Sequence, residues 1–520
     1  MDFSNAFLGI ELGSTRIKTV LIDEKYQVIA SGNHDWENRL VGGLWTYSLD
    51  DVWEGVREAY SNLASQIAER FGSAPTTVGR ICISAMMHGY LAFDKGGRLL
   101  VPFRTWRNTN TGEAAAKLSF ALEFNIPHRW SAAHYYQAAI DAEEHVGEVA
   151  YLATLAGYVH WKLTGEKVMG IGDASGMFPV EGADYNADML EKFYEMCAKY
   201  GVDAHGIFPQ ILLAGADAGK LTQEGALLLD PSGKLRAGIP FCPPEGDAGT
   251  GMAATNSTAE RTGNVSAGTS IFAMAVLTKP LNGAYPEIDV VATPDGKPVA
   301  MVHCNNCTSD LDAWIKVFGE FSSIAGLHLD ISDLYKVLYE AALRGDPDCG
   351  GLLSYNYLSG EPITSSEEGR PLFVRLPDAA FTFENFARTL LSATIATLRI
   401  GMDILTQKED LRLDVLNGHG GLFKISEVGQ RLMAAALNLP VAVNRSAGEG
   451  GAWGAALLAA YATQKGSGES LDTFLSNRVF VGMGGVIAEP DSSDAEGFDI
   501  YMKRYTAGLG IEHAAVRMFK

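Results

Sequence analysis

The chain has 520 residues, of which 47% are apolar, and a formal net charge of −21. This length predicts two domains, and the composition is typical of a globular protein with sizeable cores. The negative charge disfavours nucleic acid and anionic membranes as partners, and no apolar stretch stands out that could span a bilayer.

The first half begins with strands expected at 7–12, 17–23 and 28–31, followed by a helix at 49–71. Ser48 and Asp51 have the spacing of a capping box at the start of this helix, and Gly72 ends it. A buried strand is expected at 78–84, and the turn signal at 95–98 predicts a hairpin that joins 91–94 to 99–101. Residues 110–235 have mainly helical periodicity.

The second half begins near 255–262, where we place the boundary between a domain of residues 1–258 and one of residues 259–520. Gly263 to Ser270 and the apolar run 271–277 predict a strand, a tight turn and a second strand. Helices are expected at 383–405, 425–437 and 452–462, and strands at 413–416 and 441–443. Strands that pair with neighbours and also alternate with helices favour mixed α/β sheets.

Six cysteines are scattered through the chain, and neither a basic segment nor a long apolar run opens it. Free thiols in a reducing cytoplasm are therefore expected. Cys304 and Cys307 have the spacing of half a zinc site, but no second cysteine pair lies at the spacing of a zinc finger.

The strand–turn–strand pattern at 263–277 repeats one at 9–22. In both turns, small residues let backbone N–H groups approach an anion closely, and hydroxyl groups can bond phosphate oxygens. One such turn is common in ordinary hairpins, but two at matched positions predict two similar domains that grip the phosphates of ATP. The residues of the two turns are Gly13, Ser14, Thr15, Gly268, Thr269 and Ser270.

Two acids are candidates for phosphoryl transfer to an alcohol, which needs Mg²⁺ and a base. Asp247 lies among glycine and alanine residues that leave room for a substrate, and a helix that begins just after it would hold its carboxylate ionised. Glu11 lies beside the first turn, where a hard oxygen ligand suits Mg²⁺, and Asp247 is a second metal candidate. Alternatively, Asp247 is a helix N-cap and Glu11 is an exposed acid at a strand end.

Two glycine clusters, at 417–421 and 447–451, are candidates for contact with the ribose or purine, and neither has the P-loop pattern. The segments 86–89 and 105–108 are candidates for a polyol site, which needs hydrogen-bonding groups and an apolar surface. His88 could equally be a structural histidine after a buried strand. The candidate residues are Gly420, Gly421, Gly450 and Gly451 for the nucleotide and Met87, His88, Trp106, Asn108 and Asp247 for the sugar.

Together these motifs resemble the FGGY family of carbohydrate kinases, within the actin, hexokinase and Hsp70 superfamily. The resemblance covers most of the chain, and Gly246-Asp247 falls at the family's catalytic aspartate. The matching segments are 7–19 for the first phosphate motif, 86–89 for the sugar loop, 161–176 for a mid-domain stretch, 266–270 for the second phosphate motif, and 418–421 and 448–456 for the nucleotide-binding end.

The resemblance implies an α/β fold of two actin-like (ribonuclease H-like) domains of βββαβαβα type, with mixed β-sheets flanked by helices and with ATP and the sugar in the interdomain cleft. It implies that Asp247 acts as general base toward a terminal hydroxyl of the sugar. It also implies that Mg²⁺ assists transfer of the γ-phosphate and that domain closure excludes water. Family members are often homodimers.

Three positions depart from the family pattern. The family usually has Asp where this chain has Glu11, whose side chain is one methylene longer, so that metal contact is direct or through water. The sugar loop of many xylulokinases reads W-N-D-x-R, whereas Trp106-Arg107-Asn108-Thr109-Asn110 here replaces both the acid and the arginine. Met86 stands where Gln often precedes Met-His.

The longer runs at 84–90, 244–251 and 447–454 look most like a shorter, xylulokinase-like branch of the L-ribulokinases. We therefore expect conversion of L-ribulose to L-ribulose 5-phosphate, as in arabinose catabolism, with a xylulokinase acting on D-xylulose as the alternative. Two other classes stay open, an Hsp70-like or actin-like ATPase and a non-catalytic sugar sensor. Asp247 in its glycine setting argues against the first, and the lack of a basic helix-turn-helix extension argues against the second.

Overall fold

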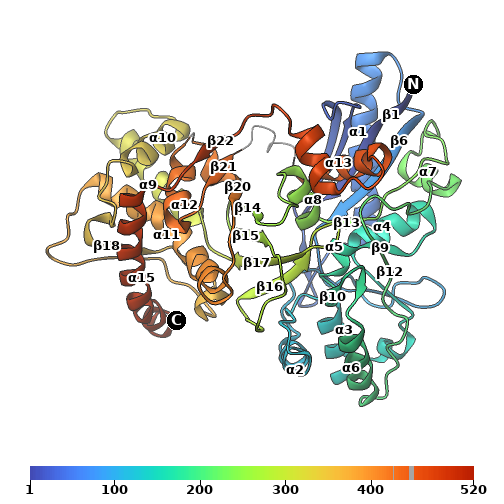
Figure 1. Cartoon of the computed structure of the whole chain (residues 1–520), viewed down its shortest axis with the longest axis horizontal. Coiled ribbons are helices and arrows are strands. Elements are labelled where there is room, and N and C mark those ends of the chain that lie inside the picture. Colours follow the sequence, from blue (N-terminus) through green and yellow to red (C-terminus); the bar gives the residue numbers. More distant parts are fainter. Residues whose placement is uncertain (426, 444–449, 520) are drawn as a thin grey trace. The chain divides into compact units, whose positions relative to one another are not determined.

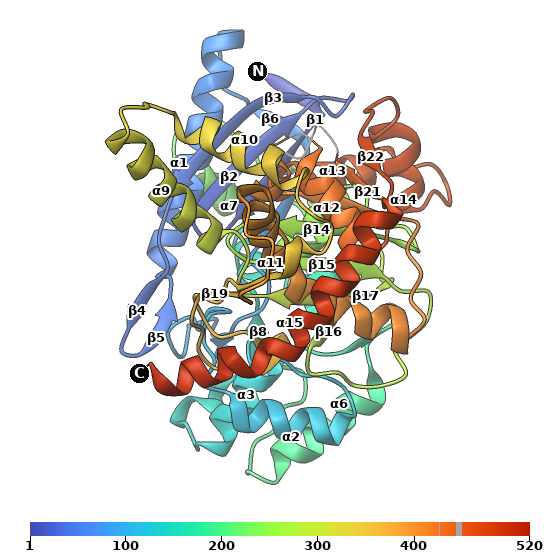
Figure 2. The same cartoon turned by 90° about the vertical axis from the view of Figure 1, so that its left-hand side faces the viewer.

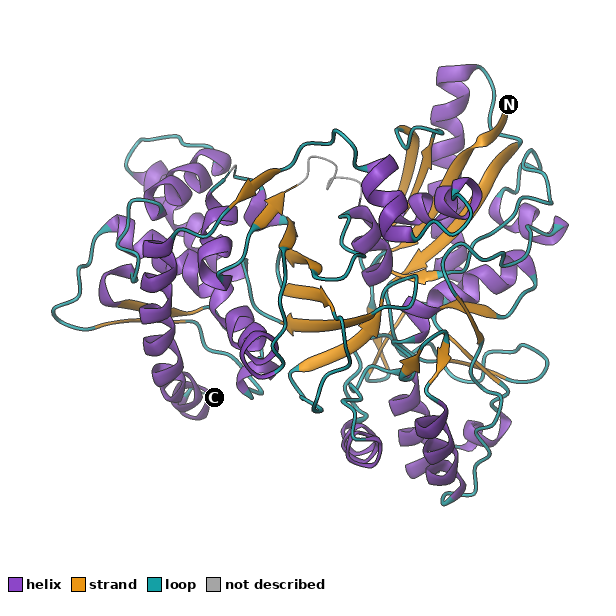
Figure 3. Cartoon of the chain, in the orientation of Figure 1, coloured by secondary structure: helices purple, strands orange, loops and turns teal. Residues whose placement is uncertain are grey.

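The computed structural model describes residues 1–425, 427–443 and 450–519, and these residues form two compact units. Unit 1 comprises Met1–Thr258, Thr278–Val299 and the described residues of 448–482. Unit 2 comprises Ala259–Leu277 and the described residues of 300–447 and 483–520. Each unit contains a large β-sheet and several helices (Figure 1, Figure 3).

The sheet of unit 1 has the strand order β13-β6-β1-β2-β3. Its central strand, β1, pairs antiparallel with β2 on one side and parallel with β6 on the other. The predicted three-stranded meander is confirmed, and its third strand continues to Asp35. The strands are β1 (Asp2–Leu12), β2 (Arg16–Ile22), β3 (Val28–Asp35), β6 (Thr77–Ala85) and β13 (Glu245–Gly246).

Side-chain alternation along β1 gives this sheet two apolar faces. Leu8 and Ile10 belong to a core that is shared with α1, α4 and α7, whereas Phe7 belongs to a second core that is shared with α8 and α13. Glu11 is an even number of residues from Phe7 and therefore lies on the α13 face. The helices are α1 (Leu49–Phe71), α4 (Leu155–Thr164), α7 (Gln223–Leu229), α8 (Asp247–Ala254) and α13 (Gly450–Gln464).

α1 has the bounds that its sequence predicts. The hydroxyl of Ser48 accepts the Asp51 amide over 3.0 Å at its start, and Gly72 ends the helix with a left-handed φ of 87°. This positive φ is a conformation that glycine adopts without a steric penalty.

The region 110–235 contains short strands between its helices. The other elements of unit 1 are β4 (Arg39–Val41), β5 (Leu44–Thr46), β7 (Leu91–Phe93), α2 (Gly112–Leu122), α3 (Ser131–Ile140), β8 (Tyr151–Ala153), β9 (Val168–Gly170), α5 (Ile171–Ala174), β10 (Val180–Glu181), β11 (Asp184–Tyr185), α6 (Ala187–Ala198), β12 (Gln210–Leu212), β16 (Ile288–Ala292) and α14 (Leu471–Phe474).

The hairpin predicted at 91–101 is wrong in its second strand. The turn forms, and the Arg98 amide donates to Oδ1 of Asp94 over 2.9 Å. Beyond it Leu99 bridges to Phe93 and the Leu100 amide donates to the Ala92 carbonyl over 2.9 Å, so the two segments pair without a continuous second strand. On its other side β7 pairs antiparallel with β8. Pro102 follows and has no amide hydrogen with which to continue a strand ladder.

The strands of unit 2 run in the order β17-β15-β14-β20-β21-β22. β14 pairs antiparallel with β15 and parallel with β20, as β1 pairs with β2 and β6 in unit 1. The repeated glycine turn therefore joins equivalent strands in two mixed sheets, and the predicted two-domain α/β fold is confirmed. The strands are β14 (Thr262–Ala267), β15 (Ile271–Val276), β17 (Pro298–Cys304), β20 (Val415–His419), β21 (Val441–Val443) and β22 (Val486–Ala488).

Helices cover the sheet of unit 2, and the long helix α15 packs against α11 and α12 (Figure 2). A separate hairpin is formed by β18 and β19. The elements are α9 (Ser309–Ile324), α10 (Ile331–Ala342), α11 (Phe383–Asp403), α12 (Val428–Leu437), α15 (Ser492–Met518), β18 (Leu352–Tyr355) and β19 (Leu372–Arg375).

One helical segment among the described residues, Phe383–Lys408, has the length and apolar composition that could cross a membrane. This segment differs from the expectation that no apolar stretch is long enough to span a bilayer. In unit 2, 72% of its most apolar window is buried, as is typical of a core helix.

Candidate active site

The first glycine turn is held through its carbonyl groups. The indole N–H of Trp36 donates to the Gly13 carbonyl over 2.7 Å, and the hydroxyl of Tyr47 donates to the Ser14 carbonyl over 2.6 Å. The two rings stack with their centroids 4.1 Å apart. Ser14 and Thr15 are exposed, so their hydroxyl groups are accessible to a phosphate.

The second glycine turn is held at the start of α9 in unit 2. The Gly268 amide donates to the Ser270 carbonyl over 2.9 Å. The hydroxyl and the amide of Thr308 both donate to the Gly268 carbonyl, over 2.9 Å and 3.1 Å. Thr269 contributes its carbonyl to the amide of Cys307 over 3.0 Å. As in the first turn, carbonyl groups fix the backbone.

The first of the two glycine clusters meets this turn. A Cβ on Gly420 would lie 2.5 Å from the Ala267 carbonyl oxygen, and Gly420 has a φ of 103°. Only glycine tolerates both conditions, so the end of β20 closely approaches the end of β14. Gly421 follows at the start of a single 3₁₀ turn. The predicted loop at 417–421 is shorter than expected, since Asn417 to His419 pair with β14.

The second glycine cluster lies in unit 1, and its residues 447–449 are outside the described residues. Gly450 and Gly451 begin α13. A Cβ on Gly451 would lie 2.3 Å from a carboxyl oxygen of Glu11, and a Cβ on Gly9 would lie 2.0 Å from the Ala452 carbonyl oxygen. The first turn of α13 therefore rests directly on the end of β1.

Glu11 is engaged by this helix start and is only partly exposed. Its Oε2 accepts the Ala452 amide over 3.0 Å, and Lys18 lies opposite it in the β1–β2 ladder. Burial raises the pKa of Glu11 to about 7, with a further contribution from the negative charge of Asp247, while the Ala452 amide and Lys18 oppose the rise. The exposed strand-end acid considered above is therefore not what the structure shows.

Asp247 is the first residue of α8, and Gly246 is the N-cap. The Met87 amide donates to its Oδ1 over 3.1 Å. The side chain is exposed to solvent, yet the protein that surrounds it raises the pKa of Asp247 to about 6, against hydrogen bonds from the amides of Met87 and Ala248. An accessible carboxylate with a raised pKa is suited to accept a proton near neutral pH.

The carboxyl groups of Glu11 and Asp247 fit a hydrated Mg²⁺ ion. The negative charge of Asp247 raises the electrostatic cost of ionising Glu11, and a divalent cation would offset this repulsion. Among the described residues, no group of three or more His, Cys, Asp or Glu side chains is arranged to hold a metal ion. One or two carboxylates with water and phosphate oxygens are the usual ligands of Mg²⁺ in such sites.

His88 is buried beside these groups with a φ of 70°. Its Nδ1 lies 3.1 Å from the Gly176 carbonyl oxygen and therefore carries the hydrogen. The ring stacks on Trp130, with an interplanar angle of 17°. The side chain of Met87 packs against Gly246, where a Cβ would lie 2.2 Å from its Cγ. Met87 thus contacts Asp247 through its backbone amide, and His88 is the next residue along the chain.

Asn108 and Trp106 lie on the neighbouring loop. The side chain of Asn108 is buried, accepts the Trp45 amide over 2.9 Å and donates to the carbonyls of Trp45 and Thr105. Its amide group thus fixes the loop backbone, whereas Trp106 is 37% exposed. Contact of either residue with a sugar stays a prediction.

Comparison with known proteins decides the family. Residues 6–251 match the N-terminal domain and residues 263–463 the C-terminal domain of the FGGY family of carbohydrate kinases. This chain is an FGGY kinase. Accordingly, it is an ATP-dependent enzyme that phosphorylates a carbohydrate.

Two curated relatives and one solved structure place this FGGY kinase among its neighbours. It is 21% identical to the xylulose kinase of Haemophilus influenzae, over 90% of this chain and 93% of that protein, and 24% identical to the gluconokinase of Bacillus subtilis, over 88% of each. The crystal structure of the xylulose kinase from Rhodospirillum rubrum has the same fold, with a TM-score of 0.79, 18% identity and coverage of 98% of this chain and 99% of that one.

The FGGY kinase also contains two buried acids that the sequence analysis did not single out. Oδ2 of Asp173 accepts the hydroxyl of Thr154 over 2.5 Å, and Oε2 of Glu245 accepts the Asp173 amide over 3.0 Å. Burial raises the pKa of each carboxyl to about 8, with further contributions from Asp173 on Glu245 and from Asp247 on Asp173. Both acids lie in segments that the sequence analysis names, Asp173 in 161–176 and Glu245 in 244–251, but no role was predicted for either side chain.

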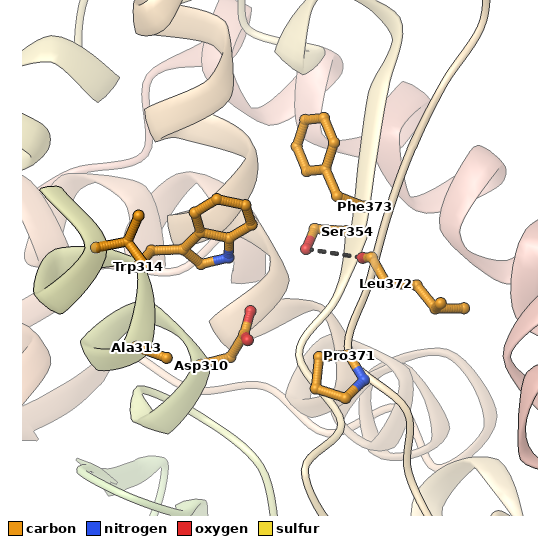
Figure 4. Close-up of a pocket in the computed structure, with 8 residues that line it drawn as sticks. Asp310, Ala313, Trp314, Ser354, Pro371, Leu372 and Phe373 are labelled. Atoms are coloured by element: carbon orange, nitrogen blue, oxygen red, sulfur yellow. Dashed lines mark hydrogen bonds between the residues drawn. The ribbon is translucent and has the colours of Figure 1, made fainter. Parts of the chain in front are cut away.

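A pocket of about 190 Å³ lies elsewhere in unit 2 of the kinase, between α9 and the β18–β19 hairpin. Figure 4 shows Asp310 and Trp314 on one side and Ser354 and Leu372 on the other. The hydroxyl of Ser354 donates to the Leu372 carbonyl over 3.2 Å. None of the predicted site residues lines it.

Proposed function

We propose that this kinase transfers the γ-phosphate of ATP to the terminal hydroxyl of a neutral pentulose, with D-xylulose as the substrate and Asp247 as the general base. The xylulose kinases among its relatives support xylulose. Since none of the relatives named above is a ribulokinase, L-ribulose becomes the second candidate.

The exposed carboxylate of Asp247 is the observation that carries the proposal. The Met87 amide fixes one oxygen, and the raised pKa, about 6, makes this group a better proton acceptor than an ordinary aspartate. At neutral pH it is ionised and can take the proton of a sugar hydroxyl as the new bond to phosphorus forms.

The charges around Asp247 favour a neutral sugar over gluconate. At neutral pH the carboxyl group of Asp247, whose pKa is about 6, is ionised, and that of Glu11, whose pKa is about 7, is ionised in part. An aldonate carboxylate would therefore meet net repulsion there, whereas a ketose carries no charge.

The two turns that are predicted to bind phosphate belong to different units. Ser14 and Thr15 in unit 1, and Thr269 and Ser270 in unit 2, supply hydroxyl groups for phosphate oxygens. Gly420 and Gly421 would lie against the ribose or purine, and Gly450 and Gly451 bring α13 to Glu11. When bound, Mg²⁺ supplies charge neutralisation for the phosphates, and Glu11 and Asp247 would hold it.

The proposed partners are the sugar and ATP alone, and a homodimer is the proposed assembly. A cytoplasmic location is proposed because all six cysteines are buried and free. The position of the site in a cleft between the two domains stays a prediction.

The test is a panel of D-xylulose, D-ribulose, L-ribulose and D-gluconate with ATP and Mg²⁺ in a coupled ADP assay. The expected kcat/KM for D-xylulose exceeds each of the others by at least about tenfold, which corresponds to ~1.4 kcal/mol of transition-state discrimination. A preference for L-ribulose would overturn the xylulose assignment, and a preference for gluconate would overturn the charge argument. ADP release that is independent of any sugar would favour a nucleotide-switch ATPase.

A further inference from the structure

We propose that Glu245 is a positioning residue for phosphoryl transfer, because its buried carboxyl group clamps the turn before Asp247 to the segment that orients His88. The proposal rests on the proposed function, since it concerns the same site. It goes further by assigning a role to an acid that is only 1% exposed and that therefore acts through its neighbours.

Both carboxyl oxygens of Glu245 are occupied by backbone amides. Oε1 accepts the Gly172 amide over 3.3 Å, and Oε2 accepts the amides of Asp173 over 3.0 Å and of Gly246 over 3.3 Å. Gly172 and Asp173 belong to α5, whereas Gly246 is the N-cap of α8. A single side chain thus joins two segments that are far apart in the sequence.

The surrounding backbone is shaped for this carboxyl group. A Cβ on Gly170 would lie 2.3 Å from Oε1 of Glu245, and a Cβ on Gly172 would lie 2.4 Å from Oε2. Any side chain at these two positions would push the α5 segment away from the carboxyl. The absence of side chains here is what allows the short amide contacts.

The clamp continues to His88 on one side. The Gly176 amide donates to the Asp173 carbonyl over 3.0 Å, and the Gly176 carbonyl lies 3.1 Å from Nδ1 of His88. A Cβ on Gly176 would lie 2.7 Å from the same nitrogen. The orientation of the His88 ring is therefore set by the segment that Glu245 binds.

The clamp reaches Asp247 on the other side. Gly246 is fixed by the carboxyl of Glu245, and the next residue is Asp247, whose carboxylate is also bonded by the Met87 amide. The proton acceptor and the His88 ring are thus held at one relative position. Misplacement of reacting groups by about 1 Å can cost about 100-fold in rate, so loosening the clamp should lower kcat.

Thr154 supports α5 from the opposite side. Its hydroxyl donates to Oδ2 of Asp173 over 2.5 Å, and the side chain of Asp173 is completely buried. Removing this hydroxyl loosens the same segment without touching Glu245. It therefore provides a second and milder perturbation.

The first experiment compares Glu245→Gln with Glu224→Gln, a matched change at an exposed acid of unit 1. Glutamine has the size of glutamate, but its NH₂ group must face a backbone N–H, because both carboxyl oxygens accept amides in the parent. We expect kcat of Glu245→Gln to fall at least about 30-fold, with the KM for ATP within about twofold of the parent. Glu224→Gln should retain the parental kcat.

Active-site titration with a nucleotide corrects kcat for any unfolded fraction of the variant. A purely structural role would therefore not lower the corrected kcat while the KM for ATP stays unchanged. A kcat within about threefold of the parent, or parallel changes in kcat and in the KM for ATP, would overturn the proposal. If Glu245→Gln does not fold, the comparison of Thr154→Val with Thr154→Ser tests the proposal instead. We expect Thr154→Val to lower kcat about fivefold and Thr154→Ser to restore it. Equal kcat values for these two variants would overturn the proposal.

The test separates the two proposals. If the parent prefers a sugar other than D-xylulose, the substrate assignment fails, and the Glu245 comparison is made with that sugar.

Discussion

The Met87 amide donates to Oδ1 of Asp247 over 3.1 Å, which joins the loop after β6 to the first turn of α8. The parallel register of β6 and β13 explains this contact, because Ser84 lies opposite Glu245 and both strands end one residue later. The backbone therefore orients the proposed base, and a change of the Met87 side chain should not remove it.

The first prediction concerns the pH dependence of catalysis. Asp247 must be ionised to accept a proton, and its pKa in the free enzyme is raised to about 6, so kcat/KM for the sugar should fall as the pH drops through about 6. An ordinary aspartate would keep its activity to about pH 4. The measurement is kcat/KM for the sugar across this range, and a flat profile down to about pH 5 would contradict the prediction.

The second prediction concerns Glu11. Glu11→Gln keeps an acceptor for the Ala452 amide but removes the charge that would hold Mg²⁺, so the half-saturating Mg²⁺ concentration should rise at least about fivefold. Glu11→Asp, the residue usual in the family, is the matched control and should retain a Mg²⁺ response within about twofold of the parent. Identical Mg²⁺ titrations for Glu11→Gln and the parent would exclude a metal role.

The third prediction concerns stability. The pKa of Asp173 is raised to about 8, so the native chain keeps this proton at pH values where the unfolded chain has lost it, above about 4. The free energy of unfolding contributed by this group is therefore present at low pH and is lost as the pH rises from about 4 to about 8. Urea unfolding measured from about pH 4 to about pH 8 should show a smaller decrease in the free energy of unfolding for Asp173→Asn than for the parent. An equal pH dependence of the free energy of unfolding in the two proteins would contradict this prediction.

The fourth prediction concerns the nucleotide loop of unit 2. Gly420→Ala places a Cβ 2.5 Å from the Ala267 carbonyl oxygen and should raise the KM for ATP at least about fivefold with little change in the KM for sugar. Gly326→Ala is the matched control, because Gly326 also has a positive φ but has nothing within 4 Å of its Cβ position. Similar ATP kinetics in both variants would indicate that the loop does not contact nucleotide.

Local patterns were sufficient to predict the hairpins at the two glycine turns and the helix Leu49–Phe71, because caps, turns and alternation depend on neighbouring residues. The contacts that build the candidate site are not local. Glu245 and Gly172 are 73 residues apart, and Glu11 and Ala452 are 441 apart. Packing of α13 on β1 and pairing of β7 with β8 have no signature in a short window of sequence, so Glu245 and Asp173 could not be identified as partners in advance.

The most direct measurement of the central claim is sugar-dependent ADP formation by Asp247→Asn. Asparagine keeps the size of the side chain and an oxygen for the Met87 amide but accepts no proton. We predict that kcat falls at least about 1,000-fold while the dissociation constant for ATP stays within about threefold of the parent. A kcat within about tenfold of the parent would contradict the assignment of Asp247 as the base.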